Sequence, residues 1–500
     1  MRFEEVETSL RSRLGAGMAR WVAGLVAGAV LSLGVVPGLM GATAASKPNF
    51  IFVLIDDMGY ADLSCYGEQQ IQTTHLDRLA GEGIRFTRFY ASAPICSPSR
   101  TAFTTGQFPA RWRITSYLAN RKENQARGMA QWLDPKAPTL ARILKEAGYV
   151  TGHFGKWHMG GQRDVGEAPL ISEYGFDESL TQFEGLGDRI LPLLDAFDGQ
   201  PPKKHALGSD NLGRGEISWM DRSKVTSAFV QRTLQFIGKA TADGRPFYVN
   251  LWPDDVHSPF FPPKDLRSDG GKGELYRGVV KAMDNQFAAL FDYVRGHPRL
   301  STNTFIIVAS DNGPEPGAGS AGSFRGHKGN LYEGGIREPF IVWAPGLQPQ
   351  QARGTVNEAT VVAAVDLLPS LLRLAEVSSP AGVQFDGEDL SPSFLGLSSQ
   401  TRTKPLFWNR PPDRPGPRGE KWPDLAVRKG DWKLLLMEDG SGAQLYDLSR
   451  DPGESRNVAS EHPAVAQDLS RQLLDWRKPL PISLPTAATN VPGPGRRPNP

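Results

Sequence analysis

The chain has 500 residues, of which 39% are hydrophobic, and a formal net charge of +2. This length can bury a large core and exceeds that of a typical single domain, so we expect one large domain with a smaller one. The nearly balanced charge argues against bulk nucleic-acid binding, and we expect no nucleic-acid partner. It still allows a local basic pocket that holds an anion.

Residues 1–45 are typical of an export signal. Arg11, Arg13 and Arg20 precede an uncharged apolar run over 21–36, Pro37 then breaks any helix, and Ala42-Thr43-Ala44 fits a small-x-small cleavage site. The run is short for a membrane span, which needs about 20 residues. We therefore predict a secreted or periplasmic protein with no stable membrane span after cleavage. An uncleaved anchor is the alternative, and Met18 competes with Met1 as the true start.

Apolar runs that end in polar residues mark the expected strands. The run Asn49 to Ile55 suits a strand buried on both faces of a parallel sheet. Similar runs follow at Tyr149 to Trp157, Phe247 to Trp252 and Thr304 to Ala309. Helical patterns lie between them at Thr139 to Ala147, Val225 to Ala240 and Tyr276 to Val294, and a last unit joins Phe340 to Trp343 with the segment Val361 to Leu374. This alternation predicts an α/β domain with a mostly parallel sheet sandwiched by helices, whose strand ends meet at one edge.

The pattern changes after about residue 378. The runs Leu425 to Met437 and Gln444 to Leu448 predict a short antiparallel sheet, with a turn at Lys429-Gly430-Asp431. An amphipathic helix is expected from Val465 to Trp476. We therefore predict a large α/β domain over 46–377, a smaller C-terminal α+β subdomain over 378–480 and a loosely ordered tail over 481–500.

Only two cysteines occur, Cys65 and Cys96, and in an exported chain a disulfide is the default expectation. However, Cys96 begins the run Cys96-Ser97-Pro98-Ser99-Arg100, which Thr105-Gly106 follows after four residues. This pattern resembles the signature of the type I sulfatase family, whereas a buried structural cysteine near a turn is the alternative. The resemblance implies that a separate maturation enzyme oxidises Cys96 to formylglycine, whose hydrated aldehyde attacks sulfur. Cys65 would then remain a free, buried thiol.

Two pairs of polar residues follow predicted strands and form a set of hard oxygen ligands, three carboxylates and one amide: Asp56, Asp57, Asp311 and Asn312. Such a set suits calcium or magnesium, and it lacks the His and Cys cluster that zinc requires. Ordinary turns at strand ends are the alternative, because these residue types are common in turns. Both pairs resemble the sulfatase metal ligands in identity and order, with residue 96 supplying a further oxygen. The expected ion is calcium, with magnesium as the alternative.

A third motif, the run from Gly155 to Gly160, resembles the Gly-Lys-Trp-His-x-Gly motif of the same family. By this resemblance, Lys156 binds a sulfate oxygen and His158 takes a proton when the sulfated intermediate collapses. Arg100 is expected to hold the diol oxygen and to neutralise charge near the metal. His153, three residues before Lys156, is assigned to structure.

The leaving alcohol also needs stabilisation or a proton. By the same resemblance, His257, in a His-x-Pro-Phe region, and Lys328, in a Gly-His-Lys-Gly run, contact the bridging oxygen. His327 is either a substrate contact or a structural hydrogen-bonding residue.

The resemblance extends from about residue 48 to about residue 460, and the overall pattern is similar to arylsulfatase A and N-acetylgalactosamine-6-sulfatase-like enzymes. It implies an alkaline-phosphatase-like fold and hydrolysis of a sulfated carbohydrate or an aryl sulfate, with the sugar and the sulfate position left open. A phosphonate or phosphate monoester hydrolase of the same superfamily is the nearest alternative. An inactive sulfoglycan-binding protein would be expected to lose at least one of Cys96, Arg100, His158 or Lys328, and all four are present.

Overall fold

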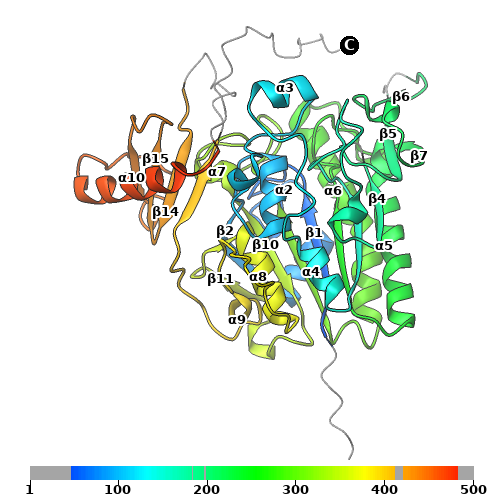
Figure 1. The fold of residues 1–500 in the computed structure, drawn as a ribbon. Helices are drawn as coiled ribbons and strands as arrows, with labels where there is room; N and C mark the ends of the chain where they lie inside the picture. Colours follow the sequence, from blue (N-terminus) through cyan, green and yellow to red (C-terminus); the bar gives the residue numbers. More distant parts are fainter. Residues whose placement is uncertain (1–46, 183, 196–198, 411–420, 482–500) are drawn as a thin grey trace, which may run out of the picture. The chain divides into compact units, whose positions relative to one another are not determined.

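The computed structural model describes residues 47–182, 184–195, 199–410 and 421–481 (Figure 1). The expected export signal, and the expected tail from residue 482 onward, lie outside the described residues. Within these ranges, no helix is both long enough and apolar enough to cross a membrane.

A twelve-stranded sheet forms the centre of the main domain. Its strands are β1 (Asn49–Ile55), β2 (Ile84–Tyr90), β3 (Val150–Gly155), β4 (Glu178–Thr181), β5 (Arg189–Leu194), β6 (Lys203–Lys204), β7 (Ile217–Asp221), β8 (Phe247–Trp252), β9 (Thr304–Ser310), β10 (Arg337–Trp343), β11 (Thr355–Asn357) and β12 (Val362–Ala363). They are ordered β11-β2-β10-β9-β1-β8-β3-β4-β5-β6, with β12 beside β2 and β7 beside β5. Among the described strands of this sheet, only β10 and β6 run antiparallel to their neighbours, so the predicted mostly parallel sheet is confirmed.

Helices cover both faces of this sheet (Figure 1). They are α1 (Thr74–Glu82), α2 (Cys96–Thr105), α3 (Arg121–Ala126), α4 (Leu140–Glu146), α5 (Val225–Ala242), α6 (Lys272–Gly296), α7 (Glu333–Ile336), α8 (Leu367–Leu374) and α9 (Ser391–Phe394). Alternate residues of β1 enter different cores, because successive side chains of a strand point to opposite faces. Phe50 and Phe52 pack with α2, α4 and α8, whereas Ile51 and Val53 pack with α1, α5 and α6. This double burial explains why the strand is apolar throughout.

A second sheet, fully antiparallel, follows near the C-terminus. It contains β13 (Leu406–Asn409), β14 (Leu425–Lys429), β15 (Trp432–Leu436) and β16 (Gln444–Asp447), in that order. Helix α10 (Pro463–Arg477) packs on one of its faces, and the other face joins the core of the main domain. The predicted small antiparallel sheet and helix are therefore confirmed, while the domain boundary at residue 378 stays a prediction.

A buried ion-pair cluster connects this second sheet to the main domain. The Nζ atom of Lys433, on β15, lies 2.9 Å from a carboxylate oxygen of both Glu333 and Glu454. Tyr90, on β2, also donates to Glu333. Removing one partner of such a buried pair leaves an uncompensated charge, which costs about 3–5 kcal/mol.

The segment expected to run as one unit from Val361 to Leu374 is divided in the structure. Val362 and Ala363 pair with β2, and the α-helix begins only at Leu367. The reason is local, because the Asp366 carboxylate accepts hydrogen bonds from the backbone N–H groups of Ala363 and Glu388. These bonds fix a turn between the short strand and the helix.

Candidate active site

The sheet places the predicted polar residues together. Strands β9, β1, β8 and β3 are adjacent and parallel, so their carboxyl ends share one edge of the sheet. Asp56 follows β1, Lys156 follows β3 and Asp311 follows β9. The Nζ atom of Lys156 lies 2.7 Å from Asp56 Oδ2. The convergence expected from the sequence is therefore observed.

Three carboxylates meet at this edge. Oxygens of Asp56, Asp57 and Asp311 lie within 4.8 Å of one another, and all three residues are fully buried. The Nδ2 atom of Asn312 donates to Asp57 Oδ1 at 2.7 Å, whereas its Oδ1 atom has no hydrogen-bond partner within the described part of the chain. A buried carbonyl oxygen without a donor, beside three carboxylates, fits a hard cation such as calcium or magnesium.

Basic side chains surround these carboxylates. Arg100 Nη2 lies 3.1 Å from Asp56 Oδ1 and 2.8 Å from Asp311 Oδ2, and Lys328 Nζ lies 2.5 Å from Asp57 Oδ2. Burial raises the pKa of Asp56, but Lys156 and Arg100 outweigh burial and hold that pKa well below its ordinary value. Burial and the Asp56 carboxylate raise the pKa of Asp311 well above its ordinary value. The cluster thus repels a further negative charge at Asp311 unless a cation compensates it.

Cys96 is the first residue of α2 and is buried against the carboxylates, with its Sγ atom 3.9 Å from Asp57 Oδ1. Burial and the Asp56 carboxylate raise the pKa of the Cys96 thiol well above its ordinary value. An unmodified thiol here stays protonated and is a poor nucleophile, because the thiolate is the reactive form. Cys65 is also free and is partly buried, beside Asp77.

His158 is held as a neutral ring. Its Nε2 atom lies 3.0 Å from the Leu118 carbonyl oxygen, which can only accept, so Nε2 carries the hydrogen. Burial and Lys156 lower the pKa of His158 well below its ordinary value. The Nδ1 atom is then free of hydrogen and lies 3.2 Å from Glu184 Oε2, outside hydrogen-bond geometry. This state suits a proton acceptor.

Glu184 is a residue of the site that sequence reasoning missed. Its carboxylate lies between His158 and Lys156, at 3.7 Å from Lys156 Nζ, and it is buried. Glu184 follows none of the recognised motifs, and no signal in the sequence identifies it.

Both Asp57 and His158 have a positive φ, which non-glycine residues adopt mainly where their surroundings impose it, as at functional sites.

The expected leaving-group residues also reach the cluster. His257 Nδ1 donates to the Ser258 carbonyl oxygen at 2.7 Å, and its Nε2 atom lies 3.7 Å from Asp57 Oδ2. Burial, with Lys328 and Lys156, lowers the pKa of His257. Burial also lowers the pKa of Lys328, but Asp57 outweighs it and raises that pKa above its ordinary value. The resting site therefore combines a neutral His257 with a charged Lys328.

Two further histidines that the sequence analysis considered, His327 and His153, lie outside the carboxylate cluster. The Nδ1 atom of His327 donates to the Lys328 carbonyl oxygen, and its ring packs edge-on against Trp422. A substrate contact for His327 stays a prediction. His153 is buried between Trp157 and Trp252, and burial lowers its pKa to about 3, so the structure places it in the core.

Comparison with known proteins decides the family. The sulfatase family model matches residues 48–377, which is more than half of the chain. The chain belongs to the sulfatase family. A second model, described as the C-terminal part of N-sulphoglucosamine sulphohydrolase, matches residues 322–479.

Individual relatives of this chain are themselves named as sulfatases. It is 34% identical to N-acetylgalactosamine-6-sulfatase of Canis lupus familiaris over 391 residues, which cover 75% of this chain and 70% of the relative. It is 31% identical to arylsulfatase A of Bos taurus, with 86% of each chain covered. The crystal structure of Ps i-CgsB with k-i-k-neocarrahexaose has a TM-score of 0.69 at 24% identity, covers 86% of this chain and 93% of that one, and shares the fold. The protein is thus a sulfuric ester hydrolase.

Proposed function

We propose that this sulfatase removes sulfate from a sulfated carbohydrate, using a formylglycine made from Cys96 and one bound calcium ion. The observation that carries the proposal is the position of Cys96, at the start of α2, inside a buried cluster of carboxylates and cations. The named relatives support the substrate class, because two of them act on sulfated sugars or aryl sulfates by name. The N-terminal pattern supports export, and a separate maturation enzyme would act on Cys96.

In this proposal, Asp56, Asp57, Asp311 and Asn312 hold the cation, and magnesium is the alternative ion. The cation supplies positive charge beside residue 96. It would also replace the countercharge that Lys328 now provides to Asp57. Lys328 and Lys156 could then turn to the oxygens of the substrate sulfate. Arg100 stays between Asp56 and Asp311, where its guanidinium fixes the spacing of the two carboxylates.

Formylglycine, as a hydrated aldehyde, supplies two oxygens at one carbon, one for attack and one for release. The chain supplies the proton acceptor, because His158 keeps an unprotonated Nδ1 atom in its neutral ring. Glu184, 3.2 Å from that atom, would stabilise the charged ring after proton uptake. Lys328 and His257 would hold and protonate the leaving oxygen. The negative charge of a bound sulfate would raise the pKa of His257 and favour its protonated form.

Comparing esters that differ in the attacked atom, sulfur or phosphorus, tests the proposed reaction. Turnover of 4-nitrophenyl sulfate, 4-nitrophenyl phosphate and a phenylphosphonate monoester should be measured on one mature preparation. We expect sulfate ester hydrolysis to exceed the other two by at least about 100-fold in kcat/KM, which is about 2.7 kcal/mol of transition-state discrimination. A preference for the phosphonate would favour the alternative function in the same superfamily. A panel of defined sulfated glycans would then identify the sugar.

The replacement His257→Ala should separate substrates by their leaving groups. A nitrophenolate leaves without help, whereas a sugar alkoxide needs a proton or a cation. We expect kcat/KM to fall by about 100-fold or more on a sugar sulfate and by less than about tenfold on 4-nitrophenyl sulfate. His75→Ala, outside the cluster, is the control. Equal losses on both substrates would refute the assignment of His257 as the acid.

A further inference from the structure

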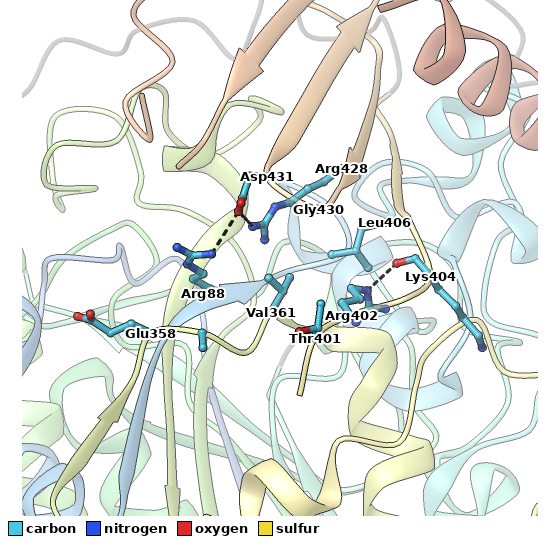
Figure 2. Close-up of a pocket in the computed structure, with 11 residues that line it drawn as sticks. Arg88, Glu358, Val361, Thr401, Arg402, Lys404, Leu406, Arg428, Gly430 and Asp431 are labelled. Atoms are coloured by element: carbon cyan, nitrogen blue, oxygen red, sulfur yellow. Dashed lines mark hydrogen bonds and ion pairs between the residues drawn. The ribbon is translucent and has the colours of Figure 1, made fainter. Parts of the chain in front are cut away.

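A cavity of about 450 Å³ lies between the edge of the large sheet and the small sheet (Figure 2). It is bounded by β2, the segments before β12 and before β13, and the turn between β14 and β15. Its lining residues are Arg88, Glu358, Ala359, Val361, Thr401, Arg402, Lys404, Leu406, Arg428, Gly430 and Asp431. This set has no member in common with the cluster around Cys96.

The cavity contains a buried arginine whose hydrogen-bonding capacity is unused. Arg428 is only 3% exposed, and its Nε and Nη1 atoms have no hydrogen-bond partner within the described ranges. Its third nitrogen, Nη2, is 3.9 Å from Asp431 Oδ1, beyond hydrogen-bond distance. The guanidinium also lies 4.7 Å from the centre of the Tyr90 ring. Asp431 and the buried Glu333 carboxylate offset part of the Arg428 charge, but within the described ranges its Nε and Nη1 donors still lack an acceptor, which a ligand in the cavity would supply.

The lining carries four basic side chains, Arg88, Arg402, Lys404 and Arg428, against two carboxylates, Glu358 and Asp431, so its balance is positive. Arg402 is already paired, because both of its terminal nitrogens contact the buried carboxylate of Asp366. Arg88 lies 3.3 Å from Asp431, whose side chain is half-exposed. Lys404 donates to the Gly387 carbonyl oxygen and keeps its charge. Figure 2 shows Arg88 and Arg428 approaching Asp431 from two sides.

We propose that this cavity binds an oxyanion group, the sulfate or carboxylate of an acidic saccharide, at a second site apart from the one that removes sulfate. Arginine forks match such groups through paired N–H donors, and the volume suits a ligand of about one sugar unit. Val361 and Leu406 give the cavity an apolar wall for the sugar ring. The saccharide part rests on the proposed substrate class. Free inorganic sulfate, the product of the proposed reaction, is also an oxyanion and is the second ligand that the cavity could bind.

Titration of the full-length protein with sucrose octasulfate, and separately with sodium sulfate, tests this site. Arg88→Gln, whose side chain is 31% exposed, is the main variant, and Arg428→Gln is the second. Arg450→Gln, at an 88% exposed side chain, is the control. We expect Arg88→Gln to weaken sucrose octasulfate binding about tenfold, with turnover of 4-nitrophenyl sulfate unchanged within about twofold, because a lost charge-assisted contact costs about that much.

The two titrations distinguish a saccharide-bound oxyanion from free sulfate as the ligand of the cavity. Weakening with sucrose octasulfate alone assigns the cavity to a saccharide, and weakening with both ligands assigns it to a free oxyanion as well. Unchanged binding of both ligands to Arg88→Gln, with the same result for a folded Arg428→Gln, would overturn the proposal. Failure of the wild-type enzyme to hydrolyse 4-nitrophenyl sulfate would instead count against the proposed function, and it leaves the binding result intact.

Discussion

Replacing Cys96 by alanine is expected to reduce sulfate ester turnover by about 10⁴-fold or more, because the nucleophile is lost. The side chain lies inside the carboxylate cluster, with its Sγ atom 3.9 Å from Asp57 Oδ1. Cys96→Ser is expected to fail in multiple turnover as well, because a serine supplies one oxygen where the hydrated aldehyde supplies two. Steady-state kinetics on 4-nitrophenyl sulfate measures both losses.

Maturation provides an independent measurement. Protein made together with a formylglycine-generating enzyme should carry, at residue 96, the mass of an aldehyde in place of a thiol, and activity should rise with the converted fraction. Cys65→Ala should keep both properties, because Cys65 is a partly buried free thiol that contacts Asp77. Full activity in a preparation whose Cys96 is an unmodified thiol would contradict the mechanism. The raised pKa of that thiol already makes such activity unexpected.

The strands that position the site were predictable because they are buried on both faces. The structure shows Asn49–Ile55 and Phe247–Trp252 with the expected bounds. A short, continuous apolar run is typical of a strand that is buried on both faces of a parallel sheet. The segment after Val361 was harder, because apolar residues continue through a short strand, a turn and a helix without a break. Asp366 decides where that helix begins, through contacts with Glu388 that lie 22 residues away in the sequence. The short strands β4 to β7 carry no such pattern and were missed.

The residues of the candidate site also divide into those that the sequence identifies and those that it does not. Asp56, Cys96, Lys156 and Asp311 lie in motifs that local sequence can carry, because each motif directly follows a strand or starts a helix. The contacts between these residues could not be predicted from local sequence. Arg100, for example, contacts both Asp56 and Asp311, which lie 255 residues apart in the chain. Glu184 reaches His158 through a loop that has no pattern of its own. Glu454 likewise reaches Lys433 and the Glu333 backbone N–H in a buried cluster that no local sequence pattern predicts.

Removal of the metal is expected to abolish activity and to lower the melting temperature. The carboxylates of Asp56, Asp57 and Asp311 are buried within 4.8 Å of one another, so an ion that leaves them takes away much of their countercharge. A ligand present at 100 times its dissociation constant stabilises the folded state by about 2.7 kcal/mol. We therefore expect chelation to lower the melting temperature by several degrees, and added calcium to restore both temperature and turnover, with magnesium less effective.

The variant Asp311→Asn connects that effect to these ligands. Its side chain has nearly the same shape, so the fold should persist, whereas the loss of one carboxylate should weaken calcium binding at least about tenfold. The calcium-dependent rise in melting temperature should then disappear at a calcium concentration that saturates the wild type. Asp439→Asn, in the loop after β15, should behave as the wild type does, because that carboxylate is exposed and contacts Ser441. Restoration of chelated wild-type enzyme by zinc alone, with calcium inert, would show that the oxygen ligand set has been misassigned. Melting temperature and turnover test separate parts of the proposal, since an immature Cys96 abolishes turnover but leaves the proposed calcium ligands Asp56, Asp57, Asp311 and Asn312 in place.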